Sequence, residues 1–454
     1  MPAREAGPHP QSLDAGDPPR SSSRAPAGRA LLLVRGLCVF GVRWGARRLR
    51  RAQPPGRILG EELTVLFERL GATYIKLGQI LSSRPDLLSH EVTEPLKRLQ
   101  DDVAPVPAEE VRARVESATG RAIDELFEHF DDEPVASASI AQVHRARLRA
   151  PAGEDAPDAL PRDVAVKVRR PRVAEEVDAD FRLLRFGARL LARLPPLKAV
   201  PMEELIAELE APIRQQLDLR LELAHLERFR SSFRSVEHVR LPRPLPALSN
   251  DTVLVMEFLD DLEKVTTQRF DETERRTAAL AGLRALYKMI FQDGFVHADL
   301  HPGNVFLRPW GEVVILDTGL VAELGDQDLQ DFVDFFFGLV NDRGEDCARV
   351  LWDTALYRSP KTDRVAFDEA IRALVSRHAA LRSRDFEVTR FVFELIETQR
   401  RHGIRGSTTF IMTVLSMVVY DGICKLLYPE CEFQREARGY LVAAKYRRYR
   451  AAPV

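Results

Sequence analysis

Apolar positions in the first part of the chain recur with the spacing of helices. One apolar stripe runs over several helical turns through Leu63, Leu66, Phe67, Leu70, Tyr74, Leu77 and Leu81. Pro85 ends this run, and a second helical stretch is expected around Glu91 to Leu99. A third helix is predicted from Ala108 to Thr119, because Pro and acidic residues open it and Gly120 closes it. The pattern therefore predicts a helical unit ahead of any sheet.

The spacing changes at Val135, where short alternating segments replace the helical pattern. VASASIAQVHRARL and DVAVKVRR are predicted to form strands, and DTVLVMEFL adds a strand from Thr252 to Phe258. Helical spacing occupies roughly 173–194 and 202–232, and it dominates beyond Thr273 except around HADLHPGN and EVVILDTGL. The order of helical unit, small β-rich lobe and helical lobe predicts an α+β fold.

Composition favours a soluble protein of two or three domains in a reducing compartment. The chain has 454 residues, of which 45% are hydrophobic and 30% are charged, and this is enough apolar content for packed cores. Its four Cys are scattered without zinc-site spacing or a disulfide pattern. A cytoplasmic location is therefore expected.

Basic residues gather at both ends of the chain. The first 57 residues hold eleven Arg against three acidic residues, a balance of +8 (11 − 3), and KYRRYR spans 445–450. Both ends are expected to be largely disordered, with no nucleic-acid partner. The apolar segment Ala30–Val42 is too short for a membrane span and is interrupted by Arg35. The alternative for this basic N-terminus is a helix lying on an anionic membrane surface or against isoprenoid lipid.

Three polar side chains are spaced for phosphoryl chemistry. Asp299 and Asn304 lie in the loop HADLHPGN, and Asp317 follows Asp299 by 18 positions (317 − 299). This spacing fits a catalytic loop, a short hairpin (VFLRP and EVVIL) and an acid at the hairpin's exit. Phosphoryl transfer uses one carboxylate to orient the nucleophile, and an amide and a second carboxylate to hold Mg²⁺ on the nucleotide phosphates. The pattern predicts Asp299 as the catalytic carboxylate, Asn304 and Asp317 as metal ligands, and ATP with Mg2+ as cofactors.

Upstream segments supply the other parts of such a site. Lys167, in the strand VAVKV, suits pairing with phosphates, and Glu222 in LDLRLELAHLERF is the candidate partner of that Lys. A hinge at Met256, Glu257 and Phe258 is expected to offer backbone groups to adenine. Taken singly, these residues have ordinary explanations, since a strand Lys is usually solvated and a helix Glu is usually a surface charge. Their order and spacing favour nucleotide-dependent phosphoryl chemistry.

Together these motifs resemble the atypical kinases of the UbiB family, also called aarF-domain kinases, over about residues 58 to 430. KLGQ is similar to the family's KxGQ signature, ASASIAQVH to its alanine-rich nucleotide loop, and VAVK, HADLHPGN and LDTG to its remaining motifs. The resemblance implies a bilobal protein-kinase-like fold with a small N-lobe, a helical C-lobe and an N-terminal helical extension that carries KxGQ. It implies nucleotide contacts from Ala136, Ser137, Ala138, Ser139, Ile140, Ala141 and Val143.

The resemblance also implies that the KxGQ helix lies across the cleft, with Lys76 and Gln79 as gating residues met by an ExD motif. The corresponding stretch here begins with Gln216 and ends with Asp218, so an amide replaces the Glu while the Asp is retained to pair with Lys76. The alternative for Lys76 is a surface lysine lying beside Tyr74.

Several departures from protein kinases argue against a protein substrate. Ala residues replace glycines in the nucleotide loop, which predicts a stiffer loop and a different nucleotide pose. Ala298 replaces the Arg that reads a phosphorylated activation loop, and Thr318 replaces an aromatic residue between Asp317 and Gly319. A helix follows within a few residues, with no APE-like motif. The metal ligands are kept, while the parts that dock and regulate protein substrates are lost.

These expectations divide the chain into five parts. They are a basic N-terminus (1–57), a helical KxGQ extension (58–134), an N-lobe (135–260), a helical C-lobe with the catalytic loop (261–441) and a basic tail (442–454). The apolar segment Phe410–Pro429 is expected to be a buried helix, because Asp421 and Lys425 interrupt it. Any membrane contact would then be peripheral.

The resemblance implies an atypical kinase or ATPase that supports isoprenoid lipid or quinone (ubiquinone-type) biosynthesis. Two alternatives remain open at this point. One is a small-molecule phosphotransferase of the aminoglycoside or choline kinase type, which shares the HxDxxxxN loop but not KLGQ. The other is a non-catalytic module whose lipid binding is switched by nucleotide.

Overall fold

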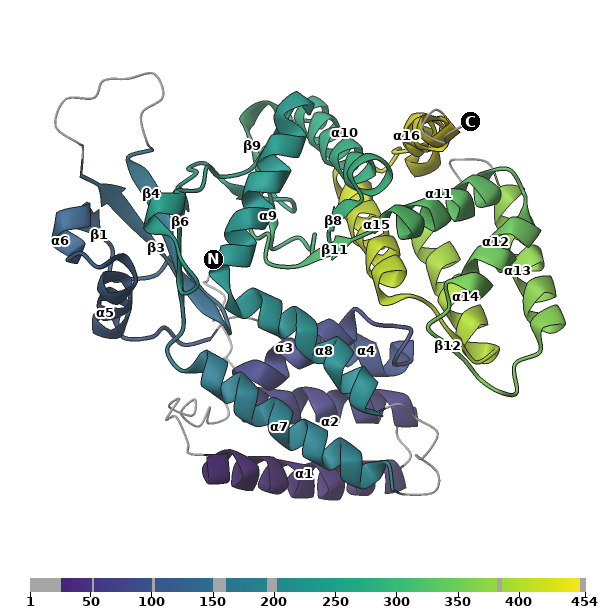
Figure 1. Cartoon of the computed structure of the whole chain (residues 1–454), viewed down its shortest axis with the longest axis horizontal. Coiled ribbons are helices and arrows are strands. Elements are labelled where there is room, and N and C mark those ends of the chain that lie inside the picture. The colour runs from purple at the N-terminus through teal and green to yellow at the C-terminus, as the bar shows by residue number, and fades with distance from the viewer. Residues whose placement is uncertain are drawn as a thin grey trace, which may run out of the picture.

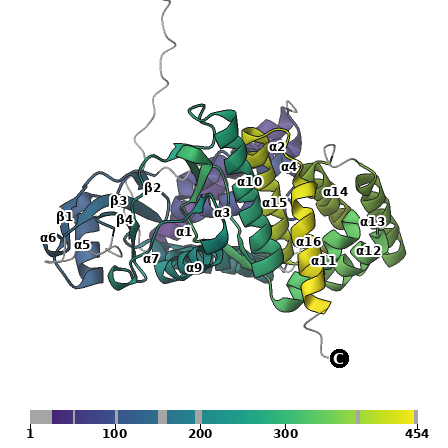
Figure 2. The ribbon, with the colours of Figure 1, turned by 90° about the horizontal axis from the view of Figure 1, so that it is seen from above.

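The computed structural model describes residues 26–50, 53–99, 103–149, 161–193, 202–381 and 386–449. They form a small β-rich lobe, a helical lobe and a helical extension (Figure 1). Figure 2 shows the β-rich lobe and helices α12 and α13 at opposite ends of the molecule. The α+β arrangement is confirmed. The disorder predicted for residues 1–25 and 450–454 lies outside the described residues.

The small lobe is built on an antiparallel sheet with strand order β1-β3-β4-β6, in which β2 pairs with β3. Its strands are β1 (Phe127–Phe130), β2 (Ala136–Ser137), β3 (Ala141–Leu148), β4 (Asp163–Arg169) and β6 (Val253–Glu257). Apolar side chains of β4 and β6 share one core with α5 (Ala108–Thr119) and α6 (Ile123–Leu126). The lobe therefore begins ahead of the boundary predicted between residues 134 and 135, because α5, α6 and β1 belong to its core.

The helical extension combines helices from two distant parts of the chain. They are α1 (Pro26–Leu49), α2 (Pro55–Leu70), α3 (Ala72–Ser82), α4 (His90–Leu96), α7 (Val173–Leu191) and α8 (Met202–Leu217). Phe67, Tyr74 and Leu77 of the predicted stripe share a core with Phe181 and Ile213. The structure thus assigns α7 and α8 to the extension, although the sequence placed them in the N-lobe.

Helix α1 differs from the prediction. It has 24 residues and packs on α2 and α7, so the disorder predicted for the N-terminus is wrong for residues 26–49. The basic tail is similarly corrected, because helix α16 continues to Tyr449. Both segments are rich in Arg, but each also has apolar residues at helical spacing. These apolar residues pack the helix against the rest of the protein.

The helical lobe contains the remaining helices around one large core. They are α9 (Leu219–Ser232), α10 (Glu272–Lys288), a π-helix (Met289–Asp293), α11 (Asp326–Val340), α12 (Gly344–Asp353), α13 (Arg364–Ala379), α14 (Val388–Arg401), α15 (Thr408–Leu427) and α16 (Phe433–Tyr449). Short strands connect them: β5 (Val239–Arg240), β7 (Glu263–Lys264), β8 (Phe295–His297), β9 (Val305–Arg308), β10 (Glu312–Ile315), β11 (Val321–Glu323), β12 (Tyr357–Arg358) and β13 (Ile404–Arg405).

Helix α15 is the one described helix long and apolar enough to cross a membrane, by length and composition alone. Sixty-one per cent of its apolar window is buried inside the fold. Its side chains, including Phe410, Met417 and Tyr420, lie in the core of the helical lobe. This agrees with the buried helix predicted for the segment.

Candidate functional site

Lys167 on β4 joins the two lobes through a pair of carboxylates. Its Nζ lies 2.6 Å from Glu222 Oε1 and 2.8 Å from Oε2 on α9, and it also lies 3.0 Å from Asp317 Oδ2. The Glu222 side chain is 4% exposed, whereas Asp317 is 44% exposed. The structure therefore brings together three of the residues selected from the sequence, and it leaves Asp317 accessible from solvent.

The electrostatics of this cluster follow from burial and from the shared Lys. Burial raises the pKa of Glu222 to about 7, against the attraction of Lys167. For Lys167 itself, burial acts to lower the pKa, but the charges of Asp317 and Glu222 outweigh it and raise the pKa above its usual value. Burial likewise opposes ionisation of Asp317, yet the nearby Lys167 charge holds the pKa well below its usual range. The Gly319 N–H and the Lys76 ammonium lower it further.

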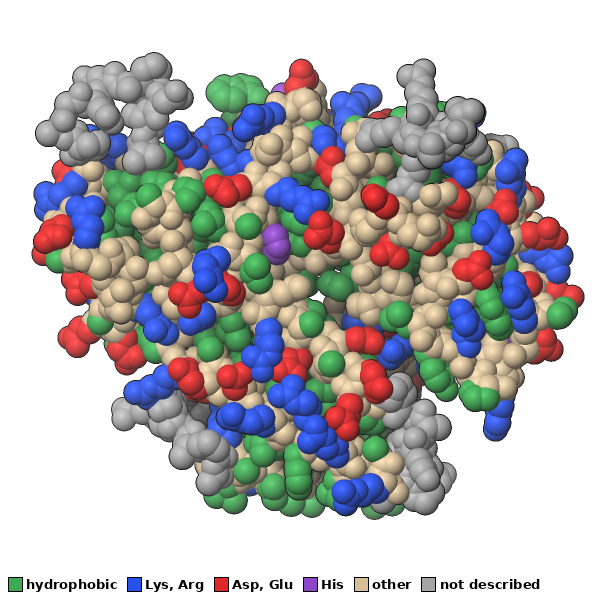
Figure 3. All heavy atoms as spheres, viewed as in Figure 1, with side chains coloured by type: hydrophobic (Ala, Val, Ile, Leu, Met, Phe, Trp, Pro, Cys, Tyr) green, Lys and Arg blue, Asp and Glu red, His purple; other side chains and the backbone are tan. Residues whose placement is uncertain are grey.

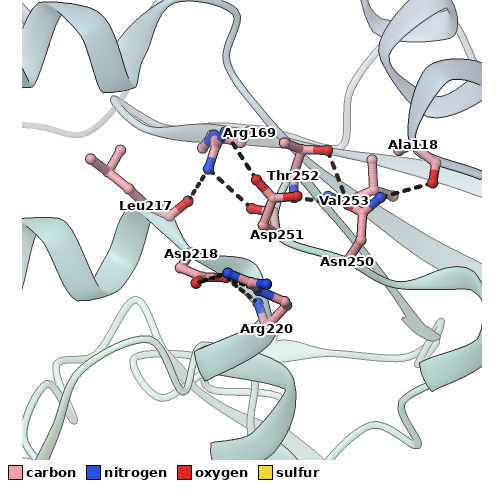
Figure 4. A network of polar contacts seen from close by, with 9 residues as sticks. All are labelled: Ala118, Arg169, Leu217, Asp218, Arg220, Asn250, Asp251, Thr252 and Val253. Atoms are coloured by element: carbon pink, nitrogen blue, oxygen red, sulfur yellow. Dashed lines mark hydrogen bonds and ion pairs between the residues drawn. The ribbon is translucent and has the colours of Figure 1, made fainter.

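The position of Glu222 depends on a break between α8 and α9 that the sequence did not reveal. Asp218 caps α9 by accepting a hydrogen bond from the Arg220 N–H at 3.1 Å, and its carboxylate also binds the Arg220 guanidinium. Arg169 donates to Leu217 O at 2.6 Å and to Asp251 O at 3.1 Å, as Figure 4 shows. These contacts hold the C-terminal end of α8 beside β4. Helix α9 starts directly after this end of α8.

The catalytic loop is held to the hairpin that follows it. Strands β9 and β10 pair as the spacing predicts, with Val305 opposite Ile315. At the base of this hairpin, the Leu316 N–H donates to Asn304 O at 3.1 Å, which places Asn304 next to Asp317. Asn304 Nδ2 donates to Asp299 O at 2.9 Å. Hydrogen bonds of the loop and of the hairpin base thus connect Asn304 to Asp299 and to the residue before Asp317.

His297 was overlooked in the sequence and ties these segments together. Its ring is 1% exposed, its Nδ1 accepts from the Asp299 N–H at 3.2 Å, and its Nε2 donates to Asp317 O. These roles require the neutral tautomer protonated on Nε2, and burial accordingly lowers the pKa of His297. The signal was its position two residues ahead of Asp299, where a side chain can reach back to the loop.

Thr318 shows what replaces the aromatic residue. It is fully buried, and its hydroxyl donates to Glu222 O at 3.2 Å, while its carbonyl accepts from His225 Nδ1 at 3.0 Å. The Gly319 N–H donates to Asp317 Oδ1 at 2.8 Å. The lost packing contact is thus exchanged for hydrogen bonds that link the DTG segment directly to α9.

The alanine-rich loop forms a tight hairpin. Ser137 pairs with Gln142, and the Ala138 N–H donates to Ala141 O at 2.8 Å. No residue from 136 to 143 has a positive φ, as expected for a loop without Gly. The tip residue Ile140 is buried in the core of the extension.

Arg170, which directly follows β4, also binds this hairpin. Its guanidinium donates to Ala138 O at 2.6 Å, to Ser137 Oγ at 2.7 Å and to Ala104 O at 3.0 Å. The loop is thereby connected both to β4 and to the segment leading out of the extension. The stiffness of the loop stays a prediction, and the sequence pattern gave no sign of the role of Arg170.

The KLGQ segment lies on α3, within the extension. The positive charge of Lys76 is one of the influences that lower the pKa of Asp317. Gln79 Nε2 donates to Leu99 O at 3.3 Å, which is a contact within the extension. Gln216, the amide in place of the ExD Glu, lies so close to Gly319 that a Cβ there would be 3.5 Å from its Cγ. The extension therefore borders the DTG segment.

Two backbone N–H groups of the predicted hinge already donate hydrogen bonds within the protein. The Glu257 N–H donates to Arg243 O at 2.7 Å, and the Phe258 N–H donates to Asp163 O at 2.9 Å. Adenine bound through these two amides would have to displace them. Met256 lies on β6 opposite Ala165 and is buried.

The donor set fits Mg²⁺ held on a nucleotide better than a metal caged by protein. The candidate ligands are the amide oxygen of Asn304 and the accessible carboxylate of Asp317, both oxygen donors. Across the described residues no group of three or more His, Cys, Asp and Glu could hold a metal alone. Mg²⁺ commonly uses one or two protein oxygens and completes its shell with phosphates and water.

Comparison with known proteins agrees with these features. A family model described as ABC1 atypical kinase-like domain matches residues 98–351. The "Probable protein kinase UbiB" of Vibrio parahaemolyticus is 30% identical over 399 residues, which cover 86% of this chain and 71% of the relative. That of Vibrio vulnificus is 30% identical over 411 residues, covering 88% and 73%.

A solved structure of Rv3197 from Mycobacterium tuberculosis in complex with erythromycin is similar in fold. The likeness has a TM-score of 0.54 at 22% identity and covers 83% of this chain and 93% of that chain. At this identity it bears on the fold alone, and it agrees with the bilobal kinase-like architecture. The family model and the Vibrio relatives show that the chain belongs to the ABC1 atypical kinase-like family, with UbiB proteins among its relatives.

Proposed function

We propose that this protein binds Mg–ATP between its lobes and transfers the terminal phosphoryl group to water or to a small hydroxyl-bearing acceptor. The observation that carries the proposal is Lys167, bound at once to Glu222 on α9 and to Asp317 after the hairpin. A kinase-like site needs these three groups assembled for the phosphates to be held. Asn304 adjoins Asp317 through the base of the hairpin.

Each residue has a definite task in this proposal. The Lys167 ammonium binds the phosphates, and Glu222 orients it. Asn304 and Asp317 supply oxygen ligands, and bound Mg²⁺ neutralises phosphate charge. Asp299, whose side chain is 34% exposed, accepts the proton of the attacking hydroxyl. His297 keeps Asp299 and Asp317 in register through its two ring nitrogens.

The geometry favours a small acceptor over a protein. Only eight residues, 318–325, separate Asp317 from α11, and three of them form β11 against β8. This leaves no long segment to serve as a platform for a peptide. The Vibrio relatives are named "Probable protein kinase UbiB". The family resemblance supports an acceptor or role in isoprenoid lipid or quinone biosynthesis.

Nucleotide binding and hydrolysis by the purified protein test the proposal. Asp317→Asn should weaken Mg–ATP binding at least about tenfold, equivalent to about 1.4 kcal/mol, in a calorimetric titration. Asp299→Asn should preserve binding and abolish turnover. The matched control is Asp353→Asn, which changes an exposed acid at the end of α12. Undiminished binding by Asp317→Asn would contradict the metal assignment, and full turnover by Asp299→Asn would contradict its role as base.

Lys76 is proposed to gate the cleft through its charge near Asp317. Lys76→Ala should change the hydrolysis rate or the preference between ATP and ADP, because Asp317 loses one of two nearby cations. Identical rates and preference would leave Lys76 as a surface lysine of the extension. Binding without turnover by the wild type, with and without acceptor mimics, would favour the non-catalytic alternative.

A further inference from the structure

We propose that the extension docks on an anionic membrane through a face formed by α1 and the second half of α7. Exposed large apolar side chains gather there, since eight of the nineteen such residues in the described part of the chain lie on these two helices. They are Leu31, Val34, Leu37, Val42 and Leu49 on α1, and Phe186, Leu190 and Leu191 on α7. We call these eight residues the α1–α7 face. Phe186, at 69% exposed, is the largest of them.

The two helices lie side by side although about 150 residues separate them in the chain. Arg29 on α1 binds Asp180 on α7, and its Nη1 lies 3.4 Å from Glu176 Oε2. The Arg29–Asp180 pair is buried. Figure 1 places both helices along the lower edge of the molecule, where Figure 3 shows hydrophobic side chains with basic side chains above them. The sequence expected membrane contact from the N-terminus alone, whereas the face also needs α7.

The exposed apolar residues on α1 are not the side by which this helix packs on the extension. The opposite side of α1 already packs on the extension through Leu32, Leu33 and Phe40. On that side Arg43 and Arg47 bind Glu62 at 2.6 and 2.9 Å. α1 is therefore apolar on two sides, and the only charged residues exposed beside the apolar ones on its outer side, Arg35 and Arg48, are basic.

Charge identifies the occupant. α1 contains five Arg and no acidic residue, and residues 181–191 of α7 contain three Arg and no acidic residue. Five of these eight Arg form ion pairs with acidic residues of the extension, so the charge that faces solvent is mainly that of Arg35, Arg48 and Arg182. Arg35 and Arg182 are exposed beside the apolar residues. An anionic lipid surface accepts both features, because apolar side chains enter the acyl boundary while Arg binds the headgroups.

Other occupants fit less well. A second copy of the chain would bring Arg-rich helices against each other, which like charges oppose. Residues 1–25 have only Met1 and Leu13 as large aliphatic side chains, too few to cover the face. Docking would also hold the site near the bilayer, because α3 with Lys76 packs on α7 and α8. The inference does not depend on phosphoryl chemistry.

Vesicle sedimentation with the full chain provides the first test. The probes are phosphatidylcholine vesicles with and without phosphatidylglycerol. The double variant Val34→Asp/Phe186→Asp should weaken binding to the anionic vesicles at least about tenfold. Val365→Asp is the matched control, since Val365 is 66% exposed on α13 in the other lobe, and it should bind as the wild type does. Thermal melting confirms that all variants remain folded.

A fluorescent label tests placement without relying on the variants. Cys38 on α1 is exposed, whereas Cys347 and Cys424 are buried, so Cys431→Ser leaves Cys38 as the reactive thiol. An environment-sensitive dye on Cys38 should shift to the blue with anionic vesicles, and the shift should weaken at high salt. Equal binding by the double variant, an unshifted dye, or loss of binding by Val365→Asp would each overturn the proposal. So would a wild-type dimer that the double variant dissociates without change in vesicle binding, which would identify a second copy as the occupant.

Discussion

The glycine of KLGQ should be required by packing, and Gly78→Ala tests this directly. A Cβ on Gly78 would lie 2.2 Å from Leu99 Cδ1 and 2.6 Å from Phe67 Cδ2, well inside the optimal carbon separation of about 3.5 Å. Leu99 and Phe67 are 4% and 7% exposed, so neither has free space to enter. Overpacking a filled core costs about 1–3 kcal/mol, and Ala regains about 1 kcal/mol of helix propensity over Gly. The expected net loss is on the order of 1 kcal/mol in the free energy of unfolding.

Urea unfolding measures this loss, with Gly187→Ala as the control. Gly187 also lies inside a helix, but no atom outside its own helix backbone and chain neighbours lies within 4 Å of the position of its Cβ. That substitution should stabilise the protein by up to about 1 kcal/mol. The two alanines should therefore change stability in opposite directions. If Gly78→Ala is as stable as Gly187→Ala, the packing argument for this motif fails. Because Gln79 binds Leu99 O, displacement of Leu99 should also alter nucleotide gating.

Substitutions at three further positions test the interior. Gly282→Ala would place a Cβ 1.6 Å from the hydroxyl of buried Tyr420, so a loss of about 3 kcal/mol or more is expected in thermal unfolding, and near-native stability would refute this packing. Thr318→Val removes the hydroxyl bound to Glu222 O and should lower the free energy of unfolding by about 1 kcal/mol. Thr318→Ser keeps a hydroxyl and should lose less stability. Equal losses for the two variants would exclude the hydrogen bond. Burial raises the pKa of Glu222 from 4.5 to about 7. The stability that protonated Glu222 contributes is therefore fully present below its pKa in the unfolded chain, and it is lost as the pH rises through about 7. Glu222→Gln should remove about 3 kcal/mol of that pH dependence, and unfolding curves with the wild-type slope across this range would contradict the buried acid.

The parts of the site that sequence reasoning located are those set by near neighbours. A hairpin of two four-residue strands, β9 and β10, connects Asn304 to Asp317. Their spacing in the sequence therefore places them together. α5 has its predicted bounds because its start and end signals are local, including Gly120 with a φ of 68°. The roles of these site residues remain predictions, but their placement follows from strand and loop geometry.

What sequence reasoning missed depends on contacts between distant segments. Helices α7 and α8 follow a strand of the small lobe, and nothing in their own periodicity indicates that they join Tyr74 and Leu77 in the extension. The break at Asp218 was hidden because 202–232 keeps helical spacing on both sides of it. Disorder was predicted for α1 because its arginines were counted as solvated, whereas Arg29 forms a buried pair with Asp180.

The departures from protein kinases share one physical consequence. A glycine-rich loop is replaced by a hairpin to which Arg170 is hydrogen-bonded, and an aromatic contact after Asp317 is replaced by the buried hydroxyl of Thr318. Both changes substitute short internal hydrogen bonds for elements whose position could vary. With only residues 318–325 between Asp317 and α11, no long segment remains whose modification could shift the Lys167–Glu222 pair. The extension touches this site from outside it, since Gln216 lies beside Gly319, and the same extension carries the proposed α1–α7 face.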